Sequence, residues 1–129
     1  MTDPAGLKFT KTHEWLRVEG SQGVVGVTQH AQEEISDVVF VELPSVGKTV
    51  AQGAEMAVVE SVKAAFSIYA PVSGTVTEVN ESLSKDPAAV NRSPYQEGWL
   101  FRIDLKNPSE AETLMDSVQY EEWVKGGGH

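Results

Sequence analysis

The stretch Glu60-Ser61-Val62-Lys63-Ala64 decides the fold, because it joins two short apolar runs that each have the length of a strand. The run before it, residues 55–59, reads Glu-Met-Ala-Val-Val. The run after it, residues 65–70, places its apolar side chains on one parity. Two such runs with a few residues between them predict a β-hairpin with Lys63 at its tip, in solvent.

The predicted turn lacks the residues that hairpin tips prefer. Gly, Asn and Asp are favoured there because the backbone needs positive φ angles, and Val62-Lys63 offers none of them. We interpret this departure as a sign that another protein reads the side chains of the tip. A lysine at a hairpin tip more often serves only solubility. Whether Lys63 has a specific function must therefore be judged from the rest of the chain.

Composition narrows the class of protein. The chain has 129 residues and a net charge of −9, which argues against nucleic acid or a membrane as partner, since both attract basic surfaces. It has no cysteine, which excludes disulfides and thiolate catalysis. The N-terminus shows no targeting signal, and no apolar run is long enough to span a membrane. We therefore expect a bacterial cytoplasmic protein, or a mitochondrial matrix protein if the chain has been processed.

The rest of the chain alternates short strands with Gly/Pro turns, which predicts a mainly β sandwich or flattened barrel. We expect one domain over residues 1–129, with a core at about 7–105, a helical segment at about 108–125 and a flexible tail at 126–129. In the helical segment, a restart is expected at Asp116. Leu114 with Val118, and Tyr120 with Trp123 and Val124, should form an apolar side that packs on the sheet. Two further short helices are expected, at 29–35 with Thr28 as N-cap and at 86–90 with Asp86 as N-cap.

Motifs for catalysis and metal binding are weak. Ser82-Leu83-Ser84-Lys85 matches Ser-x-x-Lys, but the partner motifs that this chemistry needs are missing. His13 and His30 lack the spacing of zinc ligands, so we expect no metal site. No phosphate-binding glycine loop is present. A binding or carrier protein is therefore favoured over an enzyme.

Longer motifs resemble the biotinyl and lipoyl carrier domains. In those domains a lysine at a hairpin tip is followed by Ala-Pro-x-x-Gly-x-Val, and here the match is Ala70-Pro71-Val72-Ser73-Gly74-Thr75-Val76. The preceding glycine motif of these domains matches Val46-Gly47-Lys48-Thr49-Val50-Ala51-Gln52-Gly53. Biotin carriers flank the lysine with Met, whereas Val62 and Ala64 flank it here, so the chain looks like a lipoyl carrier.

Five segments in order resemble the H proteins of the glycine cleavage system, over about residues 7–124. They are Thr12-His13-Glu14-Trp15, Thr28-Gln29-His30-Ala31-Gln32, Val39-Phe40-Val41-Glu42-Leu43-Pro44, Val59-Glu60-Ser61-Val62-Lys63-Ala64 and Pro94-Tyr95-Gln96-Glu97-Gly98-Trp99-Leu100. The resemblance implies a barrel-sandwich hybrid of two antiparallel sheets, with short peripheral helices and a C-terminal helix.

The resemblance also implies a carrier that is not itself catalytic. Lipoate would be attached covalently to Lys63 and would carry a methylamine group from the glycine decarboxylase to the aminomethyltransferase. Dihydrolipoyl dehydrogenase and the lipoyl-attachment enzymes would be the other partners, and the carrier would be a monomer.

The same resemblance assigns the other candidate residues. Glu14 would hold the loaded amine in a surface cleft, because a carboxylate pairs with an ammonium, and Thr12 and His30 would also line this cleft. Glu60, Val62 and Ala64 would be read by the ligase at the tip. Many H proteins have an acidic residue where this chain has Phe66-Ser67, so Glu14 is the favoured amine partner.

Two alternatives stay open. The first is an H-like carrier that relays lipoate to 2-oxoacid dehydrogenases or carries sulfur intermediates. The second is an unmodified acidic protein-binding module whose hairpin tip docks a partner.

Overall fold

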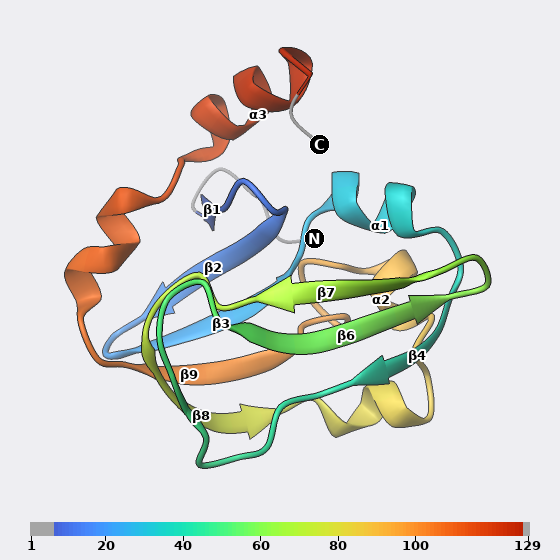
Figure 1. The fold of residues 1–129 in the computed structure, drawn as a ribbon, viewed down its shortest axis with the longest axis horizontal. Helices are drawn as coiled ribbons and strands as arrows, with labels where there is room; N and C mark the ends of the chain where they lie inside the picture. The colour runs from blue at the N-terminus through green and yellow to red at the C-terminus, as the bar shows by residue number, and fades with distance from the viewer. Residues whose placement is uncertain (1–6, 128–129) are drawn as a thin grey trace.

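Two antiparallel sheets form the body of the protein, and the computed structural model describes them over residues 7–127 (Figure 1). The larger sheet contains β1 Lys8–Phe9, β2 Glu14–Glu19, β3 Gln22–Val27, β5 Thr49–Val50, β8 Gly74–Val79 and β9 Phe101–Leu105. The smaller sheet contains β4 Val38–Glu42, β6 Glu55–Ser61 and β7 Ala65–Tyr69. The strand orders are β1-β2-β3-β9-β8-β5 and β4-β6-β7.

Short helices complete the fold, and the helical elements are α1 Gln29–Ile35, η2 Glu81–Ser84, α2 Ala89–Arg92, η3 Pro108–Thr113 and α3 Ser117–Lys125. Figure 1 shows the β6–β7 turn at the end of the smaller sheet on the same side of the molecule as α1. The predicted mainly β fold of two antiparallel sheets is thereby confirmed. The sheets remain separate in residues 7–127 and do not close into a barrel.

The predicted hairpin is present and its register is fixed. Glu60 pairs with Ala65 and Val59 with Phe66, so the loop between the two strands spans residues 61–64. The alternating apolar residues of this run face the core as expected, since Ile68 and Ala70 are buried. One strand was missed: β5 is only two residues long, and two glycines with positive φ angles, Gly47 and Gly53, lie on either side of it.

Two apolar clusters hold the elements together. The main core lies between the sheets and takes residues from both, among them Val25, Val27, Val41, Val50, Val59, Ile68, Val76 and Ile103. The second cluster joins α3 to β1 and β2, and its buried members are Leu7, Phe9, Trp15, Val24 and Tyr120. A bridge between Phe9 and Met115 ties the C-terminal segment to β1.

The C-terminal helix begins where the sequence predicts. Asp116 caps α3 in a capping box with Gln119, which satisfies two backbone N–H groups at the start of the helix. The expected pairing of Leu114 with Val118 is wrong, because Leu114 precedes the cap while Val118 lies inside the helix and is 63% exposed. The other expected group is confirmed, because Tyr120 is buried and Trp123 and Val124 pack against the same cluster.

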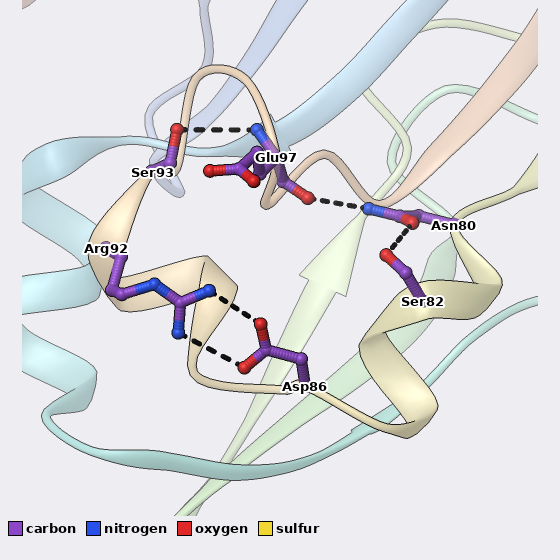
Figure 2. Close-up of polar contacts among 6 residues, drawn as sticks. All are labelled: Asn80, Ser82, Asp86, Arg92, Ser93 and Glu97. Atoms are coloured by element: carbon purple, nitrogen blue, oxygen red, sulfur yellow. Dashed lines mark hydrogen bonds and ion pairs between the residues drawn. The ribbon is translucent and has the colours of Figure 1, made fainter.

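The segment between β8 and β9 also differs from expectation (Figure 2). Asp86 is not an N-cap: α2 begins after Ala88, and the Asp86 carboxylate instead accepts hydrogen bonds from both terminal nitrogens of Arg92, at 3.1 and 2.6 Å. Asn80 is buried, and its Nδ2 donates to the carbonyls of Glu97 and Trp99, each at 2.8 Å. Asn80 therefore fixes the loop that leads into β9.

Some expectations fall on residues outside the described range. Residues 1–6 and 128–129 are not described, and they include half of the tail predicted at 126–129. Within the described part, Gly126 donates its N–H to the carbonyl of Glu122 at 3.0 Å, so the tail begins as the end of α3. No helix in residues 7–127 is long and apolar enough to cross a membrane. The assignment to one domain stays a prediction.

Gly26→Ala should destabilise the fold. An added Cβ would lie 2.6 Å from the ring of Trp15. That ring is fully buried and donates from Nε1 to the Pro94 carbonyl at 3.0 Å, so it has no room to move. We expect a loss of about 2 kcal/mol or more in urea unfolding. Ser45→Ala, in an exposed turn, is the control and should change stability by less than about 0.5 kcal/mol.

Candidate functional site

The tip of the β6–β7 hairpin is organised by the hydroxyl of Ser61. Its Oγ accepts from the backbone N–H groups of Lys63 and Ala64, each at 3.2 Å, and donates to the Ala64 carbonyl at 3.2 Å. The Ser61 N–H also donates to that carbonyl, at 2.8 Å. The Ser61 side chain thus reinforces a turn that its own backbone N–H also closes, and it holds the backbone N–H of Lys63.

This geometry corrects the interpretation of the turn. No residue of the tip has a positive φ angle, because the only non-glycine residues with one in the described chain are His13 and Ser36. Val62 is therefore unstrained, and its presence is not evidence that turn chemistry was sacrificed. Serine is itself a turn residue, since its hydroxyl can replace a backbone hydrogen bond.

The segment that follows α1 supports the tip from one side. The Val62 N–H donates to the carbonyl of Asp37 at 3.2 Å, so the turn is tied to the start of β4. Lys63 itself is exposed, and it takes part in no ion pair within residues 7–127. Its amine is therefore presented to solvent on a fixed backbone.

The three residues assigned to ligase recognition surround Lys63 in different ways. Val62 and Ala64 are exposed on either side of it. Glu60 is half-buried at the end of β6, where it pairs with Phe40 on one side and Ala65 on the other. All three lie at the surface around the amine.

Glu14 is a fully buried carboxyl at the start of β2. Its Oε1 accepts from the hydroxyls of Thr10 and Thr12, and its Oε2 accepts from the backbone N–H of Tyr69 at 3.0 Å. The Tyr69 bond links β2 of the larger sheet to β7 of the smaller one. Glu14 therefore lies at the junction of the two sheets, beside the end of β7, the strand that leads back to Lys63.

Burial changes the acidity of this carboxyl. Burial raises the pKa of Glu14 above its ordinary value, and the hydrogen bonds from Thr10, Thr12 and Tyr69 oppose the rise without cancelling it. Glu14 consequently holds a proton more tightly than an exposed glutamate does. A cation placed beside it would favour the ionised form and reverse that shift.

Two hollows follow β7 and share Thr12. The first, of about 440 Å³, is lined by Thr10, Thr12, Glu14, Gln52, Gly53, Tyr69, Ala70, Pro71 and Leu114. The second, of about 400 Å³, is lined by Thr12, His13, Val27, Ala31, Glu34, Ile35, Phe66, Ser67 and Ile68. We call the two together the β7 groove. One hollow reaches Phe66, three residues after Lys63, and the other reaches Glu14, so together they lie along β7 between the hairpin and Glu14.

The candidate cleft residues are only partly brought together. Thr12 and Glu14 meet in the groove, although Thr12 lies in the turn before β2 and is not part of the strand. His30 does not line the groove. It lines a separate hollow of about 250 Å³ beside Tyr95 and Tyr120, and its ring lies 4.6 Å from that of His13.

Three residues of the site were missed by sequence reasoning. Ser61 carries a recognisable signal, since a serine at a turn can bond backbone groups two and three residues on. Thr10 meets Glu14 only because a tight turn with a positive φ at His13 folds residues 10–14 together. Glu34 brings a carboxylate to the groove from α1, on the side where Ser67 stands in place of an acidic residue. Nothing in the local sequence indicates that α1 faces β7.

Metal binding has no support in the described residues. Among residues 7–127, no three His, Asp or Glu side chains gather closely enough to hold a metal ion. The candidate site combines an exposed lysine, a buried carboxyl and the β7 groove.

Comparison with known proteins shows the family of the chain. The family described as "Glycine cleavage H-protein" matches residues 7–127. The glycine cleavage system H protein of Symbiobacterium thermophilum is 48% identical over 124 residues, which cover 96% of this chain and 97% of that one. The H protein of Salmonella arizonae is 55% identical over 119 residues, covering 92% of each chain.

A solved structure shows the same fold. The crystal structure of a glycine cleavage system H protein from Mycobacterium marinum has a TM-score of 0.82 and 33% identity, covering 97% of this chain and 99% of that chain. These similarities do not favour a carrier for another pathway or an unmodified binding module. The chain belongs to the glycine cleavage H-protein family, the lipoyl carriers of the glycine cleavage system.

Proposed function

We propose that Lys63 is the lipoylated residue and that this chain carries a methylamine group from the glycine decarboxylase to the aminomethyltransferase. The observation that carries the proposal is the tip itself. Lys63 is exposed, has no ion pair within residues 7–127 and stands on a turn closed by Ser61. An amine in this position is open to acylation by a lipoyl-attachment enzyme.

The surroundings of Lys63 fit a long covalent arm. When bound, lipoate would supply a disulfide that can take up the methylamine group, and once the group had been passed on it would be left as a dithiol for dihydrolipoyl dehydrogenase to reoxidise. The chain contributes a fixed origin for the arm at the tip and a groove beside it. From Ala65 to Tyr69, β7 advances about 13 Å at the usual rise of a strand, so Glu14 lies within the span of a flexible arm.

Glu14 is proposed to hold the ammonium of the cargo. It lies in the groove, and the hydroxyls of Thr10 and Thr12 with the Tyr69 N–H fix its oxygens. An arriving ammonium favours the ionised carboxylate, which makes the pair a charge-assisted one. The groove would also limit the access of water to the cargo. Glu34 is a second carboxylate on the groove wall, while His30 is not part of it.

The chain is proposed to have no catalytic activity of its own. Its side chains position the arm and cargo, and the chemistry takes place on the partner enzymes. The arm raises the effective concentration of the cargo at each partner. We also propose that the chain acts as a monomer in the bacterial cytoplasm.

Production together with a lipoylation system should add one lipoyl group to the chain, and Lys63→Ala should remove it. The reason is that Lys63 is the amine presented at the tip. Intact mass and peptide mapping measure the addition. An addition at any other lysine, or none in the parent, would contradict the proposal.

Ser61→Ala should slow lipoylation about five-fold, because the turn loses the hydroxyl that fixes the backbone at Lys63, and a net loss of about 1 kcal/mol is expected when water partly replaces its exposed hydrogen bonds. The turn is exposed, so water replaces the lost contacts and overall stability should stay within about 1 kcal/mol of the parent. Ser61→Thr keeps the hydroxyl and should restore the rate. The initial rate at limiting attachment enzyme checks this, and equal rates in all three proteins would exclude the role.

Glu14→Gln should leave lipoylation unchanged and make the loaded protein lose methylamine about ten-fold faster, because a charge-assisted pair becomes a neutral one. Mass spectrometry of the loaded protein over time measures the loss, and equal rates would remove Glu14 from the mechanism.

The same variant tests the raised pKa. The folded parent binds the Glu14 proton more tightly than the unfolded chain, so its stability relative to Glu14→Gln should fall as the pH rises from near the ordinary value of 4.5 through the raised pKa. Urea unfolding across this range measures it.

A further inference from the structure

The turn that brings Thr10 and Thr12 onto Glu14 is strained at His13. The His13 N–H donates to the Thr10 carbonyl at 3.2 Å, and the Thr10 N–H donates to the Glu14 carbonyl at 3.0 Å. His13 has a φ angle of 71°, in the left-handed region that residues other than glycine adopt uncommonly. This conformation costs free energy, so the structure around the turn must hold it.

The His13 ring is held by a hydroxyl from α3. Its Nδ1 lies 2.6 Å from the hydroxyl oxygen of Tyr120 in a buried hydrogen bond. The same oxygen lies 2.8 Å from Oγ1 of Thr28, which is fully buried and caps α1. A tyrosine hydroxyl can donate one hydrogen bond while it accepts another, so one oxygen joins the His13 turn to α1. Burial raises the pKa of Tyr120 to about 12, so the hydroxyl keeps its proton at neutral pH.

Tyr120 is itself fixed in place. Its ring stacks on that of Phe9, with the ring centres 4.7 Å apart and the planes 14° from parallel. Its N–H donates to the carbonyl of Asp116 at 2.9 Å, within the capped first turn of α3. Phe9 directly precedes Thr10, so Tyr120 contacts the chain before the turn as well as at His13.

Tyr120 does not itself line the β7 groove. His13 lines the second hollow, Glu14 lines the first, and Thr12 lines both, whereas Tyr120 lines neither. An effect of Tyr120 on the groove must therefore pass through the residues that its hydroxyl holds.

We propose that the Tyr120 hydroxyl is a positioning group for the cargo. It holds His13 in the left-handed conformation, and the turn then keeps the hydroxyls of Thr10 and Thr12 on the Glu14 carboxylate. Glu14 is thereby fixed where it pairs with the ammonium of the loaded arm. This inference rests on the proposed function, which assigns that ammonium to Glu14.

Tyr120→Phe tests the hydroxyl, because it keeps the ring that stacks on Phe9. The full-length variant is lipoylated and then loaded with methylamine by the decarboxylase holoenzyme and glycine. It should lose methylamine about three-fold faster than the parent, since the partners of Glu14 are less well fixed. Mass spectrometry over time measures the loss, and circular dichroism at the assay temperature checks that the variant is folded.

A double variant separates positioning from general loosening of the fold. Glu14→Gln alone should speed the loss about ten-fold, as stated above. If Tyr120 acts through Glu14, the variant that combines Tyr120→Phe with Glu14→Gln should also stay near ten-fold. Independent effects would instead multiply to about thirty-fold.

Tyr95→Phe is the matched control. Tyr95 lines the same hollow as Tyr120, and its hydroxyl accepts from the Gln29 N–H at 2.9 Å, at the start of α1. Removing this hydroxyl takes a hydrogen bond from the α1 backbone and leaves the bond between Tyr120 and His13 intact. Tyr95→Phe should therefore keep the parent rate of methylamine loss.

Two substitutions at His13 test the same bond from its other end, and they do not depend on how Tyr120→Phe folds. Asparagine tolerates the left-handed conformation and carries a polar atom at the same position as Nδ1. His13→Asn should therefore stay close to the parent rate. His13→Ala has neither property and should lose methylamine at least about three-fold faster.

Four results would overturn the inference while Glu14→Gln still speeds the loss, so that the proposed function stands. They are equal rates in the parent and Tyr120→Phe, a multiplied effect in the double variant, an equally fast Tyr95→Phe, and equal rates in the two His13 variants. An unchanged rate in Glu14→Gln would instead overturn the proposed role of Glu14, and the inference with it.

Discussion

The presentation of Lys63 depends on one small set of hydrogen bonds, those that the Ser61 hydroxyl makes across the end of the β6–β7 hairpin. They close the turn without glycine or a positive φ angle, so the residues between can be chosen for their side chains. The bond from Val62 to Asp37 ties the same turn to the next strand. The main core then fixes the hairpin against the larger sheet, which places Lys63 in solvent on a rigid base.

A second constraint is the buried carboxyl of Glu14. Burying a glutamate costs free energy, which the raised pKa reports, and three donors reduce that cost. A neutral side chain would pack there with less penalty. Retaining a carboxyl at the end of a groove is consistent with a site that receives a cation, since the cargo would supply the missing charge. The exposed lysine and the buried acid thus lie near opposite ends of β7. Lys63 comes two residues before the strand, and Glu14 accepts a hydrogen bond from its last residue, Tyr69.

Much of this could be predicted from the sequence, because short-range signals decided it. Two apolar runs of strand length with a few residues between them located the hairpin, Thr28 and Asp116 marked helix starts, and the motifs around Lys63 and Glu14 indicated the family. Contacts between distant segments could not be predicted. The meeting of Thr10 with Glu14 needs a left-handed His13, and the approach of Glu34 to β7 depends on how α1 packs. Asp86 resembled a helix cap but bonds Arg92, because α2 begins later than its Asp-Pro signal suggests.

Reconstitution with the glycine decarboxylase is the measurement that tests the central claim most directly. Exchange of labelled CO2 into glycine should require the lipoylated chain and should be absent with Lys63→Arg, which keeps the positive charge but cannot form the amide. Exchange supported by Lys63→Arg, or by the unmodified parent, would show that the amine at the tip is not where the cargo is carried.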